Sequence, residues 1–259
     1  MNRNELKKQL TTRLPLFAGW TSLGHSQVTE MLLRSKIDFL GIDIEHSTIS
    51  QEQSQRIIAS CQASGVSCLP RVASHNHEAI KRFLDSGADG VIVPTVDKVE
   101  QVEKLIEWVK YPPIGKRGFG ISHAQGYGHN FEEYTTTWNG SSILIIQIES
   151  ITAVENIEAL LQFDDVDGVM IGPYDISGSL GIPGQIDHHR VREAGQRVVE
   201  ACKTHGKACG TQDIDPSLES VRDVLASGYT FVVLASDVFI LWKWGESMAN
   251  LINLYKNKK

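Results

Sequence analysis

The chain has 259 residues, of which 41% are hydrophobic and 22% are charged, as in ordinary globular proteins. This composition excludes a disordered chain, a collagen-like repeat and a disulfide-dense miniprotein. The net charge of −6 argues against generic binding to nucleic acid or membrane surfaces, since both favour a basic excess. The N-terminal stretch lacks an apolar signal segment, and no apolar run reaches the roughly 20 residues of a membrane span. We therefore expect a cytoplasmic protein with no nucleic-acid or membrane partner.

Eight short apolar runs, rich in valine, isoleucine and leucine, alternate with longer amphipathic stretches. Near-continuous apolar runs of this length are typical of parallel strands that are buried on both faces. The predicted strands cover residues 16–21, 39–45, 67–72, 90–96, 143–149, 168–173, 207–212 and 231–236. The predicted helices between them cover residues 26–35, 76–86, 98–110, 151–162, 188–205 and 216–227.

This alternation predicts a (β/α)8 barrel, with residues 1–259 as a single domain. A doubly wound open sheet is the alternative architecture, but no GxGxxG motif follows the first predicted strand. One long region, residues 111–142, is expected to be irregular, and loops of this length in compact domains are usually functional.

Three segments share a weak internal repeat: GADGVIVPTVD, DVDGVMIGPYD and SGYTFVVLASD. Each consists of a turn, an apolar strand and an aspartate just past the strand end. These aspartates are Asp97, Asp175 and Asp237. In a barrel they are expected on the C-terminal face, where active sites lie.

Further polar residues follow the predicted strands at the same face. Gln147 and Glu149 are two residues apart in one strand, so their side chains project to the same side. A glutamate in such an apolar strand is costly to bury without a partner. With Asp175 it forms a pair of carboxylates that suits Mg²⁺ or Mn²⁺. A structural ion pair between Glu149 and Arg71 is the alternative interpretation, which the additional polar groups at this face disfavour.

Two other features of this face are candidates for catalysis or substrate binding. His46 follows Asp43 and Glu45 closely, and a histidine beside a carboxylate is a candidate acid–base group. The turn at Gly172 and Pro173 offers exposed backbone groups, which can bind a carboxylate.

Between residues 16 and 241 the sequence resembles the HpcH/HpaI-type aldolases, metal-dependent class II pyruvate aldolases that include 4-hydroxy-2-oxoheptanedioate aldolase. Each matching segment is weak alone, but their order and spacing together are specific. The segments are DIEHS at 43–47, PRV at 70–72, GADGVIVP at 87–94, YPPIGKRGFG at 111–120, QIES at 147–150, GPYDIS at 172–177 and GKACG at 206–210.

The resemblance implies a TIM barrel that binds a divalent metal, Mg²⁺, Mn²⁺ or Co²⁺, through Glu149 and Asp175. It also implies a homohexamer in which a C-terminal helix exchanges between subunits. The segment from Asp237 carries more apolar residues than one helix face can bury, which is typical of an interface; an ordinary closing helix is the alternative. Asp85 matches a position that family members contribute to a neighbour's site.

The resemblance also assigns roles to residues around the metal. Arg71 is implied as the cation that stabilises an enolate, and His46 as the acid–base group with Asp43 as its orienting partner. Gln147 is implied as a substrate contact, and the amides near Gly172 and Pro173 as the site of the pyruvate carboxylate.

Two positions depart from the family pattern. Tyr174 stands where many of these aldolases have alanine, and Gln212 stands where an apolar residue lies near the substrate methyl group. The polar side chain of Gln212 is therefore a candidate substrate contact that favours a hydroxylated or carboxylated substrate. The sequence leaves the natural aldehyde open.

We expect an aldehyde-lyase that cleaves or forms 4-hydroxy-2-oxo acids through a pyruvate enolate, with a 2-oxo acid and an aldehyde as partners. One alternative is a family member that joins another 2-oxo acid, such as oxaloacetate, in a citrate-synthase-like reaction. A non-catalytic barrel that binds a 2-oxo acid is another. Schiff-base chemistry is disfavoured, because Lys207 is the only lysine in a predicted strand and lies at its start.

Overall fold

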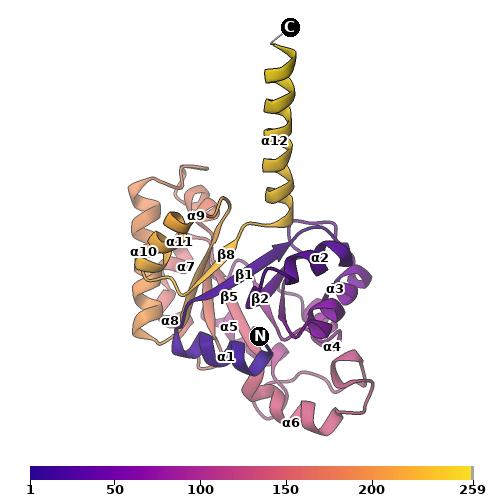
Figure 1. Cartoon of the computed structure of the whole chain (residues 1–259). Coiled ribbons are helices and arrows are strands. Elements are labelled where there is room, and N and C mark those ends of the chain that lie inside the picture. The colour runs from indigo at the N-terminus through magenta and orange to yellow at the C-terminus, as the bar shows by residue number, and fades with distance from the viewer. Residues whose placement is uncertain (258–259) are drawn as a thin grey trace.

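The computed structural model describes residues 1–257 and contains a closed barrel of eight parallel strands in chain order (Figure 1). Strand β1 pairs with β2 on one side and with β8 on the other, which closes the barrel. The prediction of a (β/α)8 barrel is confirmed, and the open-sheet alternative is wrong. The strands are β1 (Leu16–Thr21), β2 (Phe39–Asp43), β3 (Ser67–Arg71), β4 (Gly90–Val93), β5 (Ile143–Ile148), β6 (Gly168–Ile171), β7 (Ala208–Asp213) and β8 (Phe231–Leu234).

Strands β2, β4 and β6 end earlier than predicted, because charged residues or prolines follow them. Glu45 and Pro94 lie in the loops after β2 and β4, and Pro173 is the first residue of the helix that follows β6. The helices are α1 (Arg3–Thr12), α2 (Ser26–Leu33), α3 (Gln51–Ala63), α4 (His77–Asp85), α5 (Val99–Val109), α6 (Phe131–Ser141), α7 (Ile151–Glu155), α8 (Ile157–Leu161), α9 (Pro173–Ser179), α10 (His189–Thr204), α11 (Leu218–Ala226) and α12 (Asp237–Lys256).

The region 111–142 is more ordered than predicted. It contains a short 3-10 turn, η1 (His123–Gln125), and helix α6. Threonine-rich α6 has weak intrinsic helix propensity, but Tyr134 and Trp138 stack one turn apart with ring centroids separated by 5.0 Å. The buried guanidinium of Arg117 lies 4.4 Å from the Trp138 ring centroid. Packing against a cation therefore stabilises a helix that the sequence pattern did not indicate.

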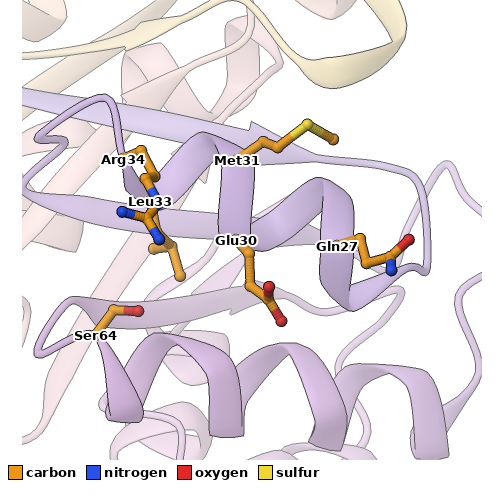
Figure 2. A pocket seen from close by; sticks show the side chains of 6 residues that line it. All are labelled: Gln27, Glu30, Met31, Leu33, Arg34 and Ser64. Carbon is orange, nitrogen blue, oxygen red and sulfur yellow. The ribbon is translucent and has the colours of Figure 1, made fainter.

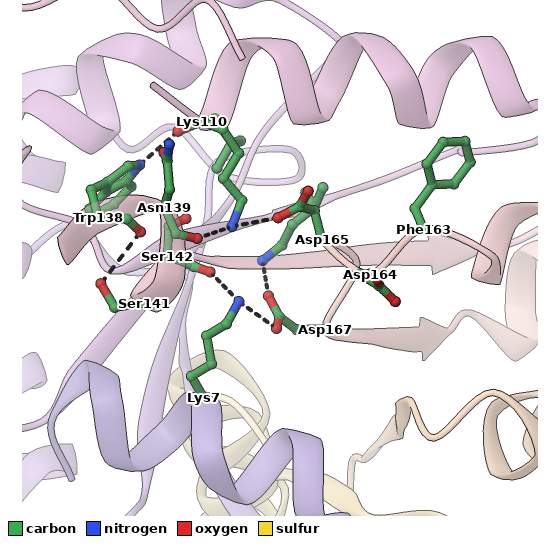
Figure 3. Close-up of polar contacts among 12 residues, drawn as sticks. Lys7, Lys110, Trp138, Asn139, Ser141, Ser142, Phe163, Asp164, Asp165 and Asp167 are labelled. Carbon is green, nitrogen blue, oxygen red and sulfur yellow. Dashed lines mark hydrogen bonds and ion pairs between the residues drawn. The ribbon is translucent and has the colours of Figure 1, made fainter. Parts of the chain in front are cut away.

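Helix α1 closes the N-terminal end of the barrel. Leu6 and Leu10 are fully buried and pack in one cluster with the inward-facing strand residues. Lys7 of this helix pairs with Asp167 at 2.8 Å and donates to the carbonyl of Ser142 (Figure 3). These charged side chains at the N-terminal end of the barrel are therefore paired within the protein. The C-terminal ends of the strands form the open face of the barrel.

Helix α12 stands away from its own barrel (Figure 1). Its apolar side chains are exposed, and none of the residues of the preceding α11 is buried. Within residues 1–257 no helix has the length and apolar character needed to cross a membrane. The exposed apolar residues of α12 are Val238, Ile240, Leu241, Trp242, Trp244, Met248, Leu251, Ile252, Leu254 and Tyr255.

Candidate active site

Arg71 is held at the open face of the barrel by three groups. It ends β3 and lies beside Asp43, the last residue of β2, in the strand register. Its Nη2 is 2.7 Å from Oδ1 of Asp43, and its Nη1 is 3.3 Å from Oε2 of Glu45. The guanidinium carbon lies 5.1 Å from the centroid of Trp20, near the end of β1. Two carboxylates and an aromatic ring therefore fix the position of this arginine.

The carboxylate of Asp43 is buried and shared among several donors. Besides Arg71, its Oδ1 accepts the backbone N–H of His46 at 3.0 Å, and its Oδ2 accepts the hydroxyl of Ser22 at 3.3 Å. Burial opposes ionisation, but the charge of Arg71 and these hydrogen bonds outweigh it and hold the pKa of Asp43 below its usual value. Asp43 therefore stays ionised beside the arginine.

His46 lies in the same cluster, but its ring has a different partner from the expected one. Its Nε2 is 3.7 Å from Oε2 of Glu45, whereas Asp43 holds only its backbone. The imidazole is 68% exposed, so it is open to a substrate or to solvent. Glu45 thus contacts both Arg71 and His46, a central position that the sequence prediction did not assign to it.

Glu149 follows β5 and is oriented by two hydrogen bonds. Its Oε1 accepts from the side-chain amide of Gln147 at 2.8 Å, and its Oε2 accepts from the backbone N–H of Thr95 at 2.9 Å. Burial raises the pKa of Glu149 to about 7; the Thr95 hydrogen bond opposes this shift, and the charges of Glu45 and Asp175 add to it. The partly buried Glu149 therefore lies among negative charges that little positive charge offsets.

Asp175 reaches the same space from the first turn of α9. A methyl group built on Gly172 would lie 3.1 Å from Oε1 of Glu149 and 3.4 Å from Oδ2 of Asp175, so both carboxylates border this glycine. The expectation for the Gly172 and Pro173 amides needs correction. Proline has no N–H, and the Gly172 N–H donates to the carbonyl of Ile148. Amides that could bind a carboxylate here belong to Tyr174 and Asp175.

The remaining expected site residues lie elsewhere. Asp85 ends α4, a helix that returns the chain toward the N-terminal end of the barrel, and it pairs with Arg117 at 2.9 Å. Within one chain it is therefore separate from the cluster around Arg71. Gln212 lies on β7 opposite Val233 and is partly exposed near the open face. The Glu149–Arg71 ion pair does not form, because Arg71 is paired with Asp43 and Glu45.

A divalent cation fits the carboxylates of this cluster. Among residues 1–257 no three histidine, cysteine, aspartate or glutamate side chains converge on one point. Mg²⁺ is nevertheless often bound through one or two carboxylates, with water completing its coordination. The buried Oε1 of Gln147 also has no hydrogen-bond partner within the described chain, which leaves an acceptor beside Glu149 for a ligand or its water.

A separate groove of about 930 Å³ lies between α2 and α3 (Figure 2). It contains none of the residues singled out above, and its lining combines ordinary helix-surface side chains. We therefore place the candidate chemistry at the mouth of the barrel. The groove is lined by Gln27, Glu30, Met31, Leu33, Arg34 and Ser64.

A parallel (β/α)8 barrel with an arginine and a carboxylate cluster at its C-terminal face has the form of a barrel enzyme. Residues 17–243 match the family model of the HpcH/HpaI aldolase/citrate lyase family, and the chain belongs to this family.

Individual relatives agree with this assignment. The chain is 34% identical to the hydroxypyruvate/pyruvate aldolase of Roseobacter denitrificans, over 95% of this chain and 96% of the relative. It is also 34% identical to the 2-keto-3-deoxy-L-rhamnonate aldolase of Klebsiella pneumoniae, over 85% and 82% of the two chains. A crystal structure of a HpcH/HpaI aldolase/citrate lyase family protein from Burkholderia cenocepacia superposes with a TM-score of 0.90 and 28% identity, covering 96% of this chain and 99% of that one.

Proposed function

We propose that this protein is a class II aldolase that cleaves and forms 4-hydroxy-2-oxo acids through a pyruvate enolate. The observation that carries this proposal is the cluster at the barrel mouth, in which the charges of Arg71, Glu45 and Asp175 act on Glu149. The near full-length relatives named above are also aldolases by name. We infer that the whole chain acts as one barrel domain.

Glu149 and Asp175 are the residues that would hold the metal, with Gln147 orienting Glu149. A bound Mg²⁺, Mn²⁺ or Co²⁺ supplies Lewis acidity toward the carboxylate and keto oxygens of a 2-oxo acid. The amides of Tyr174 and Asp175 would bind the substrate carboxylate from the start of α9.

The other residues act on the substrate itself. In cleavage, the bond between C3 and C4 breaks, and its electron pair forms the enolate. Arg71 stabilises the negative charge that develops on the enolate oxygen. Because Asp43 and Glu45 already hold the guanidinium, no reorganisation is needed during the reaction. His46 accepts the proton of the C4 hydroxyl, and Glu45 stabilises the imidazolium that results.

A direct test uses metal-free protein and a simple 4-hydroxy-2-oxo acid, with pyruvate release followed by a coupled lactate dehydrogenase assay. We expect pyruvate to appear only after Mg²⁺ or Mn²⁺ is added. Undiminished release in the presence of excess chelator would contradict the proposal. A screen of aldehydes in the synthetic direction then identifies the natural acceptor, with attention to hydroxylated aldehydes because Gln212 is polar.

We also propose that the protein is a homohexamer in which α12 packs on a neighbouring subunit and Asp85 borders a neighbour's site. The exposed apolar residues of α12 and the absence of buried residues in α11 support this proposal. We expect Trp244→Glu to lower the mass measured by light scattering, with Glu246→Gln on the same exposed helix as the control. A hexamer that persists in Trp244→Glu, or a monomeric wild type, argues against helix exchange.

A further inference from the structure

Asp237, the first residue of α12, is anchored to the end of β1. Asp237 is 4% exposed. One oxygen accepts the hydroxyl of Thr21 at 2.6 Å and the N–H of Leu23 at 3.1 Å. The other accepts the N–H of Ser22 at 2.9 Å and that of Val238 at 2.8 Å. Four donors therefore satisfy both oxygens of a buried carboxylate, which fixes the β1–α2 loop to the start of α12.

The residues that Asp237 holds contact the groups that position Arg71. The N–H of Ser22 is fixed by Asp237, and the Ser22 hydroxyl donates to Oδ2 of Asp43 at 3.3 Å. The other oxygen of Asp43 holds Arg71 at 2.7 Å. Trp20, just before this loop, lies under the same guanidinium. The end of β1 thus supports both the carboxylate and the ring that position Arg71.

We propose that Asp237 is a positioning residue for Arg71, acting through Ser22 and Asp43. This inference rests on the proposed role of Arg71 in stabilising the enolate. Through these hydrogen bonds the first residue of α12, the helix with the exposed apolar face, is connected to Arg71. An asparagine at 237 has one acceptor oxygen in place of two, and its amide group would face donors, so the loop would shift.

The test compares Asp237→Asn with Asp38→Asn as a matched control. Asp38 also fixes β1 with its carboxylate, accepting the N–H of Phe17 at 2.8 Å, but at the N-terminal end of the strand. We expect Asp237→Asn to lower kcat by about tenfold with little change in KM or Mn²⁺ affinity, because a transition-state contact is weakened while the metal ligands stay in place. Asp38→Asn is expected to keep the wild-type kcat.

A double-mutant cycle with Ser22→Ala tests whether the effect of Asp237 on Arg71 is transmitted through Ser22. If Asp237 acts through Ser22, the loss in kcat from Asp237→Asn becomes smaller in the Ser22→Ala background. A folded Asp237→Asn enzyme with wild-type kcat, or fully additive losses, overturns the inference.

A crystal structure of Asp237→Asn provides a readout that does not depend on turnover. We expect Ser22 to move from Asp43 and the Arg71 guanidinium to shift. An unmoved Arg71 overturns the inference even if the wild type proves inactive toward 2-oxo acids. An inactive wild type would by itself count only against the proposed function.

Discussion

Gly172 is the position where a single methyl group most directly tests the carboxylate cluster. In Gly172→Ala the new carbon would lie 2.8 Å from Cγ of Glu149, 3.1 Å from its Oε1 and 3.4 Å from Oδ2 of Asp175. The backbone itself tolerates alanine, because φ at this residue is −102°. The substitution therefore acts through the clash with Glu149 and not through backbone strain.

The size of the effect follows from the contact distances. Carbon atoms in contact are normally about 3.5–4.0 Å apart, so Glu149 must move by several tenths of an ångström or more. Overpacking of this kind costs about 1–3 kcal/mol. Disturbing the support of a metal ligand typically lowers metal affinity by about 10- to 100-fold. We expect a loss of Mn²⁺ affinity in this range, with a similar loss of activity at limiting metal.

Isothermal titration with Mn²⁺ and thermal unfolding of the metal-free protein separate the two effects. Gly178→Ala is the matched control, since Gly178 lies in α9, the helix that Gly172 precedes, and a methyl group there would meet nothing within 4 Å. We expect this control to bind Mn²⁺ as the wild type does. Wild-type Mn²⁺ affinity in Gly172→Ala would refute the assignment of the space beside Gly172 as the metal site.

Three further predictions address the reaction class, the electrostatics of the barrel and the arginine. Lys207→Arg should keep full activity, because the Lys207 amine donates to the carbonyl of Phe163 at the closed end of the barrel, away from the site. A pyruvate adduct that borohydride traps in the wild type but not in Lys207→Arg would instead indicate a Schiff base. Burial raises the pKa of Asp167 above its usual value although the charge of Lys7 opposes the shift, so the stability that Asp167 contributes at low pH is lost as pH rises through the raised pKa. Denaturant unfolding across the acid range should therefore show a flatter pH dependence in Asp167→Asn, and identical slopes would contradict this. Arg71→Lys should lower kcat by about 100-fold, because an ammonium cannot hold two carboxylates as a guanidinium does; a steady-state assay showing wild-type kcat would count against the enolate role.

The sequence indicated the barrel well because its strands are buried on both faces. Such strands leave continuous apolar runs that are visible without any tertiary information. The sequence pattern does not predict helix α1, because only Leu6 and Leu10 mark its buried face in an otherwise charged and polar segment. The pattern does not predict helix α6 either, because the aromatic stacking and the contact with Arg117 that stabilise it are tertiary.

The sequence predicts those residues of the candidate site that lie at or just after the ends of strands. Alternation in β5 correctly placed Gln147 beside Glu149. The partner of Arg71 was not predictable, because the register between β2 and β3 decides that it meets Asp43 and not Glu149. The contact of Asp237 with Ser22 joins residues 215 positions apart, and only closure of the barrel brings them together.

Proton exchange at the methyl group of pyruvate is the most direct measurement of enolate formation, since it needs no knowledge of the aldehyde. In deuterated buffer with Mn²⁺, we expect the wild type to incorporate deuterium, as observed by loss of the methyl proton signal. Glu149→Gln should abolish this exchange, whereas Asp167→Asn, the same chemical change at the closed end of the barrel, should retain it. Exchange that persists in Glu149→Gln with excess chelator would contradict a metal-dependent enolate mechanism at this site.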